Sequence, residues 1–390
     1  MPSINKYTRW SGVWSLTEVA QAKASNKWPT TTNPLMDLFA WGKNTSGELG
    51  IGDATAARSS PVQLGSHKWT SFSAGLKHCG GIKSDGTLWL WGSNAFGQLG
   101  FGTVNNYSYP KQVGSDSNWQ KVVCGYKDTI ALKKDGTLWC WGDNTYGTVG
   151  DNTVISRSSP VQIGALTTWT DVSLGIGACT AIKSDGTMWG WGYNGWGNVG
   201  DGSSTTVHRS SPVQIGSGIG SDWISVAGGG YHQLAMRSGG GVYGWGRNNY
   251  GQAGGLGDKS TPSLITGAYT AAAISGGTWH TGIISTDGTL WFCGRNDVGQ
   301  FGNNGTNSIM TSATQTGSST DWSKISCGFG KTMVIKTDKT LWAMGTNNDG
   351  DLGINSLITK SSPTQVGSGT NWTQVSVSSW SDGQAFGGVT

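Results

Sequence analysis

The chain has 390 residues, of which only 12% are charged, 65 are glycine and 22 are tryptophan, and its formal net charge is +4. So much aromatic surface excludes a disordered chain, and a mild positive charge without any run of lysine or arginine does not indicate nucleic-acid binding. The start of the chain lacks a secretory pattern, and no stretch reaches the roughly 18 apolar residues of a membrane span, so we expect a soluble protein.

A leader with one short helix is predicted at residues 1–33. Ser15-Leu-Thr-Glu18 has the spacing of a helix capping box, apolar residues follow it, and a proline closes the segment. Residues 10–16, Trp-Ser-Gly-Val-Trp-Ser-Leu, and residues 27–29, Lys-Trp-Pro, resemble a segment at the beginning of tailed-bacteriophage structural proteins. That resemblance implies a virion component. The alternative is a helix that packs over one edge of the domain behind it.

The first strand of the following domain is predicted at residues 34–42, where aromatic and apolar residues alternate. A complete copy of a repeating unit is found at residues 69–114. It begins with two short strands separated by Gly75. An Asp85-Gly86 pair then predicts a hairpin turn in which both central residues have positive φ.

The next strand of this copy is residues 88–92, and the period-2 rule places Trp89 and Trp91 on one face. An Asn-x-x-Gly-x-x-Gly loop and a segment of the Ser-Ser-Pro-Val-Gln type end the unit, which is therefore about four antiparallel strands. The second strand tryptophan recurs in five copies, as Trp41, Trp91, Trp141, Trp191 and Trp245. The loop asparagine recurs about every 50 residues, as Asn44, Asn94, Asn144, Asn194, Asn248, Asn296 and Asn347. Both sets are predicted to have structural roles.

The first and last copies are both incomplete, and each supplies what the other lacks. The first copy has the tryptophan strand without the two strands before it, and residues 371–390 match those two strands alone. An open stack of such sheets would expose apolar faces and strand edges. We therefore predict an all-β fold, a seven-bladed β-propeller at residues 34–390, closed by a blade that residues 34–42 and 371–390 share.

The repeat contains Trp-x-Trp-Gly-x-Asn-x-x-Gly-x-Leu-Gly, Pro-Val-Gln-Ile-Gly and Gly-x-x-His-x-x-Ala-Ile elements. It resembles the repeat of the regulator-of-chromosome-condensation superfamily over about residues 34–390. The resemblance implies a rigid seven-bladed propeller that binds another protein on one rim. Members include an exchange factor for a small nuclear GTPase, a plant ultraviolet-light receptor and a secreted bacterial β-lactamase inhibitor, so membership does not determine one function.

The chain departs from the family pattern at the strand histidine. The seven matching positions are His78, Asp128, Ala178, His232, His280, Lys331 and Ser381. A catalytic ring of histidines is therefore not expected, and the three that are present are predicted to be structural. Only residues 278–281, Thr-Trp-His-Thr, approach the photoreceptor's tryptophan segments. The remaining tryptophans are predicted at strand positions that packing requires, so light sensing is not expected.

No set of residues indicates an enzyme, a cofactor or a metal. The chain lacks a Gly-x-Ser-x-Gly elbow, cysteines with metal-knuckle spacing and paired glycosidase carboxylates, so no catalytic, cofactor-binding or metal-binding residues are expected. The six cysteines are predicted to be buried and reduced. The aspartates after the glycine loop are predicted as turn residues rather than calcium ligands, namely Asp53, Asp151, Asp201 and Asp258.

One repeated feature goes beyond packing. A basic residue precedes the repeat proline by three positions in five copies, as Arg58, Arg157, Arg209, Lys259 and Lys360. Propeller symmetry brings equivalent positions to one height, so we predict a broken ring of cations on one rim. Such a ring would contact an acidic protein surface, an anionic polysaccharide or a phosphate. The alternative is that each is a solvated loop charge.

Our main hypothesis is a non-enzymatic interaction scaffold of a phage virion, in a tail, a fibre or beside the capsid. It would bind other virion proteins or a host surface molecule. The alternative is a regulatory propeller of the exchange-factor or enzyme-inhibitor type that binds one protein partner. In both cases we predict that recognition depends on positions where the copies differ, in the rim loops and the leader.

Overall fold

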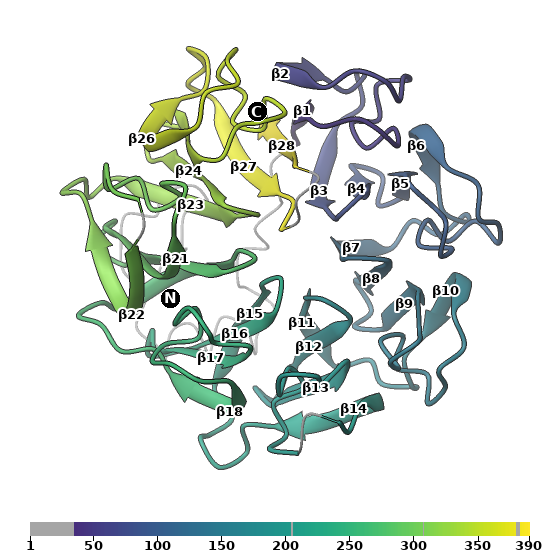
Figure 1. Ribbon diagram of the computed structural model, residues 1–390. Coiled ribbons are helices and arrows are strands. Elements are labelled where there is room, and N and C mark those ends of the chain that lie inside the picture. Colours follow the sequence, from purple (N-terminus) through teal and green to yellow (C-terminus); the bar gives the residue numbers. More distant parts are fainter. Residues whose placement is uncertain (1–34, 204–205, 307, 380–382) are drawn as a thin grey trace, which may run out of the picture. The chain divides into compact units, whose positions relative to one another are not determined.

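The computed structural model describes residues 35–203, 206–306, 308–379 and 383–390, so the predicted leader lies outside the described residues. Residues Leu35–Thr390 form one unit. Its 28 strands build seven four-stranded antiparallel sheets, and none of the described residues is helical. The sheets stand like blades around a central axis (Figure 1). This confirms the predicted all-β, seven-bladed propeller.

The first three blades each contain four strands that follow one another in the chain, from the inner strand to the outer one. They are β3 (Trp69–Ala74), β4 (His78–Lys83), β5 (Leu88–Gly92) and β6 (Tyr107–Gln112); β7 (Trp119–Cys124), β8 (Asp128–Lys133), β9 (Leu138–Gly142) and β10 (Arg157–Gln162); and β11 (Trp169–Leu174), β12 (Ala178–Lys183), β13 (Met188–Gly192) and β14 (Arg209–Ile215).

The next three blades repeat this arrangement. They are β15 (Trp223–Gly228), β16 (His232–Arg237), β17 (Val242–Gly246) and β18 (Lys259–Leu264); β19 (Ala271–Gly276), β20 (His280–Ser285), β21 (Leu290–Asn296) and β22 (Ser308–Thr316); and β23 (Trp322–Cys327), β24 (Lys331–Lys336), β25 (Leu341–Gly345) and β26 (Lys360–Gln365).

The seventh blade joins the two ends of the propeller. Its strands are β27 (Trp372–Val377), β28 (Gln384–Val389), β1 (Asp37–Gly42) and β2 (Arg58–Gln63). β1 pairs with β28 along its whole length, from Asp37 opposite Val389 to Gly42 opposite Gln384. Purple β1 therefore lies beside yellow β28 in Figure 1. The predicted shared blade is confirmed, because N-terminal strands complete a sheet begun by C-terminal ones.

The hairpin turns form at the predicted Asp-Gly pairs, but their backbone differs from the prediction. Gly86 has φ 82°, whereas Asp85 is not among the residues with positive φ. The Gly86 N–H donates to the Lys83 carbonyl at 2.9 Å, and the Lys83 N–H donates to the Thr87 carbonyl at 3.0 Å. This is a three-residue loop closed by a glycine bulge. The Asp85 carboxylate instead fixes the turn by accepting the Thr87 N–H at 2.9 Å.

The hydrophobic core lies between neighbouring blades. Trp91 and Trp69 of the first blade pack in one cluster with Leu38 and Phe386 of the seventh blade. The rings of Trp91 and Phe386 are 5.9 Å apart. Trp89 packs partly buried against the same cluster, as the period-2 rule predicts. Each blade therefore depends on its neighbour to bury its apolar face.

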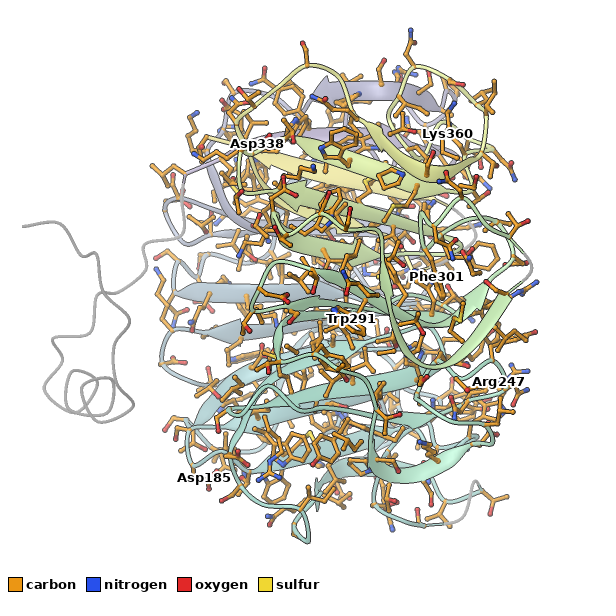
Figure 2. All side chains as sticks on the ribbon, turned by 90° about the vertical axis from the view of Figure 1, so that its left-hand side faces the viewer. Asp185, Arg247, Trp291, Phe301, Asp338 and Lys360 are labelled. Atoms are coloured by element: carbon orange, nitrogen blue, oxygen red, sulfur yellow. The ribbon has the colours of Figure 1, made fainter. Side chains whose placement is uncertain are left out.

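The blades leave two different faces on the ring. We call the face that carries the Asn-x-x-Gly-x-x-Gly loops the loop face, and the face that carries the Asp-Gly turns the hairpin face. Figure 2 shows Arg247 and Lys360 toward one side of the ring and Asp185 and Asp338 toward the other.

Candidate functional site

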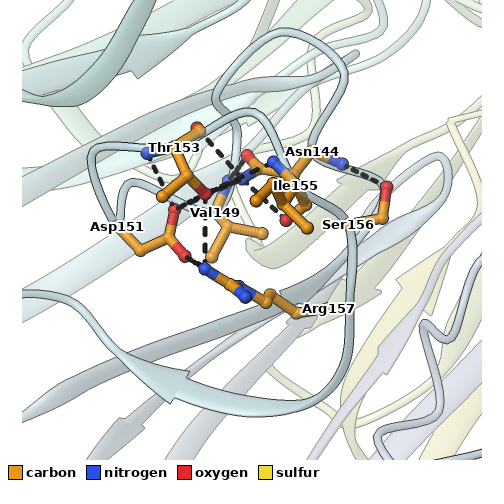
Figure 3. Close-up of polar contacts among 7 residues, drawn as sticks. All are labelled: Asn144, Val149, Asp151, Thr153, Ile155, Ser156 and Arg157. Carbon is orange, nitrogen blue, oxygen red and sulfur yellow. Dashed lines mark hydrogen bonds and ion pairs between the residues drawn. The ribbon is translucent and has the colours of Figure 1, made fainter.

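Each loop on the loop face is organised by its asparagine. Asn144 is fully buried, and its Oδ1 accepts the Val149 N–H at 2.8 Å. Its Nδ2 donates to the carbonyls of Thr153 and Ile155, both at 3.1 Å (Figure 3). The hydrogen bond from the N–H of the fifth residue after the asparagine to its Oδ1 recurs at all seven asparagines. An amide is required here, because one end of the side chain must accept and the other must donate.

The two glycines of each loop permit close contact with the next blade. Gly100 has φ 73°, and a Cβ there would lie 2.8 Å from Nε1 of Trp141 in the following blade. That Nε1 donates to the Gln98 carbonyl at 2.8 Å. The same contact closes the ring, since Trp41 Nε1 donates to the Asp351 carbonyl at 3.0 Å. In the five blades that contain this buried tryptophan, the loop of the preceding blade thus holds it.

Three of the five predicted rim cations are paired with aspartates of their own loops. The ion pairs are Arg58–Asp53, Arg157–Asp151 and Arg209–Asp201, at 2.6, 2.5 and 2.7 Å. Lys259 Nζ instead donates to the Ala253 carbonyl at 3.2 Å, and Lys360 begins β26 at the equivalent position. The predicted turn residues and the predicted rim cations are therefore largely partners of one another.

Asp151 shows both of its roles in Figure 3. Its carboxylate accepts the N–H and the hydroxyl of Thr153 at 3.1 and 2.6 Å, as expected of a turn residue, and it also pairs with Arg157. Burial opposes ionisation of Asp151, but the hydrogen bonds from Thr153 and the Arg157 charge outweigh it and lower the pKa of the carboxyl. The last of the four predicted turn aspartates, Asp258, accepts the Asn248 N–H at 2.8 Å.

The three strand histidines are buried bridges between blades. The Nε2 atoms of His78, His232 and His280 lie 2.9, 2.8 and 3.0 Å from threonine hydroxyls of the following blades. Burial is the main cause that lowers the pKa of each to about 3. A neutral imidazole sealed from solvent supports the predicted structural role.

The predicted equivalent of these histidines in the seventh blade was wrong. Gln384 pairs with Gly42 as His78 pairs with Gly92, whereas Ser381 lies outside the described residues. The connection between the first two strands is longer in this blade, which displaces the alignment. Gln384 Nε2 donates to the Gly75 carbonyl of the first blade at 2.7 Å, so it also bridges two blades.

The described part of the chain contains no group of three His, Cys, Asp or Glu side chains placed to hold a metal ion. All six cysteines are buried and free, so the predicted burial is confirmed. None of the described segments is a helix long and apolar enough to cross a membrane.

A row of aromatic side chains on the loop face breaks the sevenfold repetition. We call it the aromatic surface, and its members are Tyr146, Tyr193, Trp196, Tyr231, Tyr250 and Trp279. In the order Tyr146, Tyr193, Trp196, Tyr231, Trp279 and Tyr250, neighbouring ring centroids lie between 4.4 and 5.5 Å apart. Tyr146 is 43% exposed, and the other five are half-buried. Partly exposed rings in mutual contact form a rigid apolar area that solvent reaches.

Arg247 lies in the middle of the aromatic surface. Its guanidinium is 4.9 Å from the Trp196 ring, 5.3 Å from Tyr231 and 4.9 Å from Trp279. The Tyr231 and Trp279 rings are stacked at 4.4 Å with an interplanar angle of 19°. These contacts come from three blades, so the cation is held by cation–π interactions across blade boundaries.

A hollow of about 590 Å³ adjoins the aromatic surface. Most of its lining comes from the connections between the first two strands of several blades, including Leu76, Lys77, Tyr126, Ile176, Trp279 and Phe329, and the rest is Tyr146, Tyr193 and Trp196 of the aromatic surface. Because those connections lie around the axis, the hollow is at the centre of the loop face. Its size is within the range of sites that accept partner side chains or small ligands.

Sequence reasoning missed this surface, and it was wrong to place the remaining tryptophans at packing positions, because Trp196 lies in the loop between β13 and β14. The sequence does indicate this surface, at three positions of the repeat that are counted from the loop asparagine and the strand histidine. They are the residue before the loop asparagine (Tyr193, Arg247), the second residue after it (Tyr146, Trp196, Tyr250) and the residue before the histidine position (Tyr231, Trp279). Aromatic residues gather at these offsets in neighbouring blades only.

Known structures share this fold. Human WBSCR16 is 21% identical, with a TM-score of 0.80, and the match covers 92% of this chain and 99% of that one. Prp20p from Saccharomyces cerevisiae, whose structure was reported with its binding properties to Gsp1p and histones, is 18% identical with a TM-score of 0.81, covering 91% and 92%. Yeast RCC1 (Prp20) bound to Kap60 gives 18% and 0.81, covering 100% and 96%. No curated protein sequence matches this chain.

The family model for the Regulator of chromosome condensation (RCC1) repeat matches five segments, which are residues 37–82, 85–132, 135–182, 185–236 and 239–284. A second model with the same description matches residues 119–148 and 223–252. These segments span more than half of the chain, and each contains the two outer strands of one blade and the two inner strands of the next. The chain therefore belongs to the Regulator of chromosome condensation (RCC1) repeat family.

Proposed function

We propose that this chain is a non-enzymatic, regulatory propeller that binds one protein partner through the aromatic surface. The observation that carries the proposal is the contact series from Tyr146 to Tyr250 around Arg247, which departs from the repeat on one side of the loop face only. Packing explains the residues that recur in every blade. It does not explain half-buried rings at loop positions that vary.

The composition of this surface favours a protein partner. Tyrosine, tryptophan and arginine are the residues that contribute most to the energy of protein–protein interfaces. The rings already contact one another, and each loop backbone is fixed by its asparagine, so little conformational entropy remains to be lost on binding. A preformed, aromatic, partly exposed area with a central hollow suits an inserted segment of another protein.

The comparisons support the regulatory alternative better than the virion hypothesis. Prp20p is a propeller of this fold with binding properties to Gsp1p and histones, and yeast RCC1 is seen bound to Kap60. No comparison supports a phage structural role or a virion location. The leader that suggested one lies outside the described residues, and we propose only that residues 1–33 are separate from the propeller at residues 34–390.

The five rim cations are proposed as the outer part of the same binding face. Arg58, Arg157 and Arg209 are paired within their loops, so their net charge is largely neutralised. Their contribution is therefore expected to be smaller than that of the aromatic surface.

Site-specific photocrosslinking tests the proposal. A p-benzoylphenylalanine at Tyr146, on the aromatic surface, is compared with the same group at Leu166, which is 45% exposed and follows β10 toward the hairpin face. Full-length protein of each kind is irradiated in extract of its own source cells. We expect one discrete crosslinked protein from position 146 alone, lost when Trp279→Ala is added. Equal crosslinking from both positions, or none from position 146, would contradict the proposal.

A further inference from the structure

Arg247 differs from every other arginine in the described part of the chain. The others each pair with an aspartate: Arg58 with Asp53, Arg157 with Asp151, Arg209 with Asp201, Arg237 with Asp222 and Arg295 with Asp297. Arg247 has no ion pair among the described residues. Its Nε atom is buried and has no hydrogen-bond partner there.

The rings around Arg247 position the guanidinium without using its hydrogen bonds. A cation–π contact acts on the flat face of the group, whereas its N–H donors point outward in its plane. Such a planar fork matches the two oxygens of a carboxylate. Arg247 is therefore an oriented cation whose donors lack an acceptor.

No carboxylate among the described residues forms an ion pair with Arg247. The lining of the neighbouring hollow includes Lys77 and several aromatic residues but no aspartate or glutamate. Of the carboxylates in other loops of this face, Asp297 pairs with Arg295 at 2.5 Å and Asp143 accepts the Thr145 N–H at 3.1 Å. The charge at the centre of the loop face is complementary to an acidic group from outside.

We propose that Arg247 binds an aspartate or glutamate side chain of the protein partner, and that an apolar or aromatic side chain next to it in the partner enters the hollow. This inference rests on the proposed function, since it assigns the chemistry of the partner segment at the same surface. A carboxylate is the acceptor that satisfies the fork with two parallel hydrogen bonds. The adjacent apolar side chain covers Tyr231 and Trp279 and excludes water from the ion pair.

Peptide selection on the full-length chain tests this chemistry. Random 12-residue peptides are displayed as internal loops, so that no free carboxyl terminus is present, and the selected ones are synthesised with both ends capped. Their affinity for the wild-type chain, Arg247→Gln and Arg237→Gln is measured by fluorescence anisotropy. Arg237 is the matched control, because it lies 5.9 Å from the Trp223 ring but already pairs with Asp222. Trp279→Ala reports whether a peptide uses the aromatic surface at all.

We expect selected peptides to share an acidic residue beside an apolar or aromatic one. Arg247→Gln should weaken binding roughly 10- to 100-fold, as expected for lost hydrogen bonds between charged groups. Replacing the peptide's acid by its amide should weaken binding similarly, and the two changes together should cost no more than either alone. Arg237→Gln should change nothing. Arg247→Lys, which keeps the charge without the planar fork, should give an intermediate loss of affinity. It replaces Arg247→Gln as the test if the glutamine variant folds poorly.

The outcomes separate the two proposals. Peptides that need Trp279 but bind the Arg247→Gln variant as tightly as the wild type would overturn the carboxylate inference and leave the binding surface intact. If no selected peptide is affected by Trp279→Ala, both the inference and the proposed binding surface fail.

Discussion

Replacing Asn144 by alanine tests whether the repeat asparagine fixes the loop. The substitution leaves the buried Val149 N–H without its acceptor at 2.8 Å, which costs about 1–3 kcal/mol. The carbonyls of Thr153 and Ile155 lose a donor as well, but Ile155 is 61% exposed, so water replaces part of that loss. We expect the free energy of unfolding to fall by about 2–4 kcal/mol in total.

Urea unfolding followed by tryptophan fluorescence measures this loss. The exposed Asn105, which follows the first-blade loop, is the control, and Asn105→Ala should stay within about 0.5 kcal/mol of the wild type. Asn144→Asp adds a second test. It keeps the acceptor but faces a carboxylate toward two carbonyls and toward Asp151, so it should be more destabilising at pH 7 than at pH 4. If Asn144→Ala is as stable as Asn105→Ala, the asparagine does not hold the loop.

Two further predictions concern closure and acid stability. Deleting residues 371–390 removes β27 and β28 with two buried aromatic side chains, so we expect the free energy of unfolding to fall by at least about 6 kcal/mol. Calorimetry measures the effect, and a truncated chain that melts like the full one would contradict closure by the shared blade. Burial holds the pKa of His78, His232 and His280 at about 3 in the folded chain, below the value of 6.5 expected when unfolded. The unfolded chain therefore binds more protons as pH falls from about 6.5 toward 3. Above about pH 6.5 the buried histidines do not lower the free energy of unfolding. As the pH falls from there toward 3, each histidine lowers it by about 1.4 kcal/mol per pH unit. His232→Gln should make the urea midpoint less sensitive to pH in this range, and an unchanged slope would count against the buried imidazole.

The sequence allowed the ring to be predicted because the fold depends on residues that repeat. The asparagine series and the incomplete first and last copies were sufficient for seven blades and a shared one. The local backbone geometry could be predicted less well from the sequence. An Asp-Gly pair predicts a hairpin, but only the side-chain contact of Asp85 with Thr87 shows which turn forms. The longer connection before Gln384 could not be aligned by spacing alone.

The candidate site was harder to predict, because it is built from differences between copies. Arg157 and Asp151 could each be assigned a separate role in the sequence, and only their 2.5 Å contact shows that they are partners. Trp196 and Trp279 are far apart in the chain and occupy different positions of the repeat. They meet around Arg247 because the propeller brings loops of consecutive blades together on one face.

The way that each loop is fixed has a consequence for how this protein can change over evolution. The asparagine and the two glycines determine the path of the backbone, and the two residues before the second glycine are buried. The two residues that directly follow the asparagine are exposed or half-buried in every blade, so their side chains have no role in the core. Substitutions at those positions can alter what the ring recognises without insertions and without loss of stability. A single duplicated unit could in this way have produced a surface with a different residue at each blade, and related propellers can acquire unrelated partners while their interiors stay almost the same.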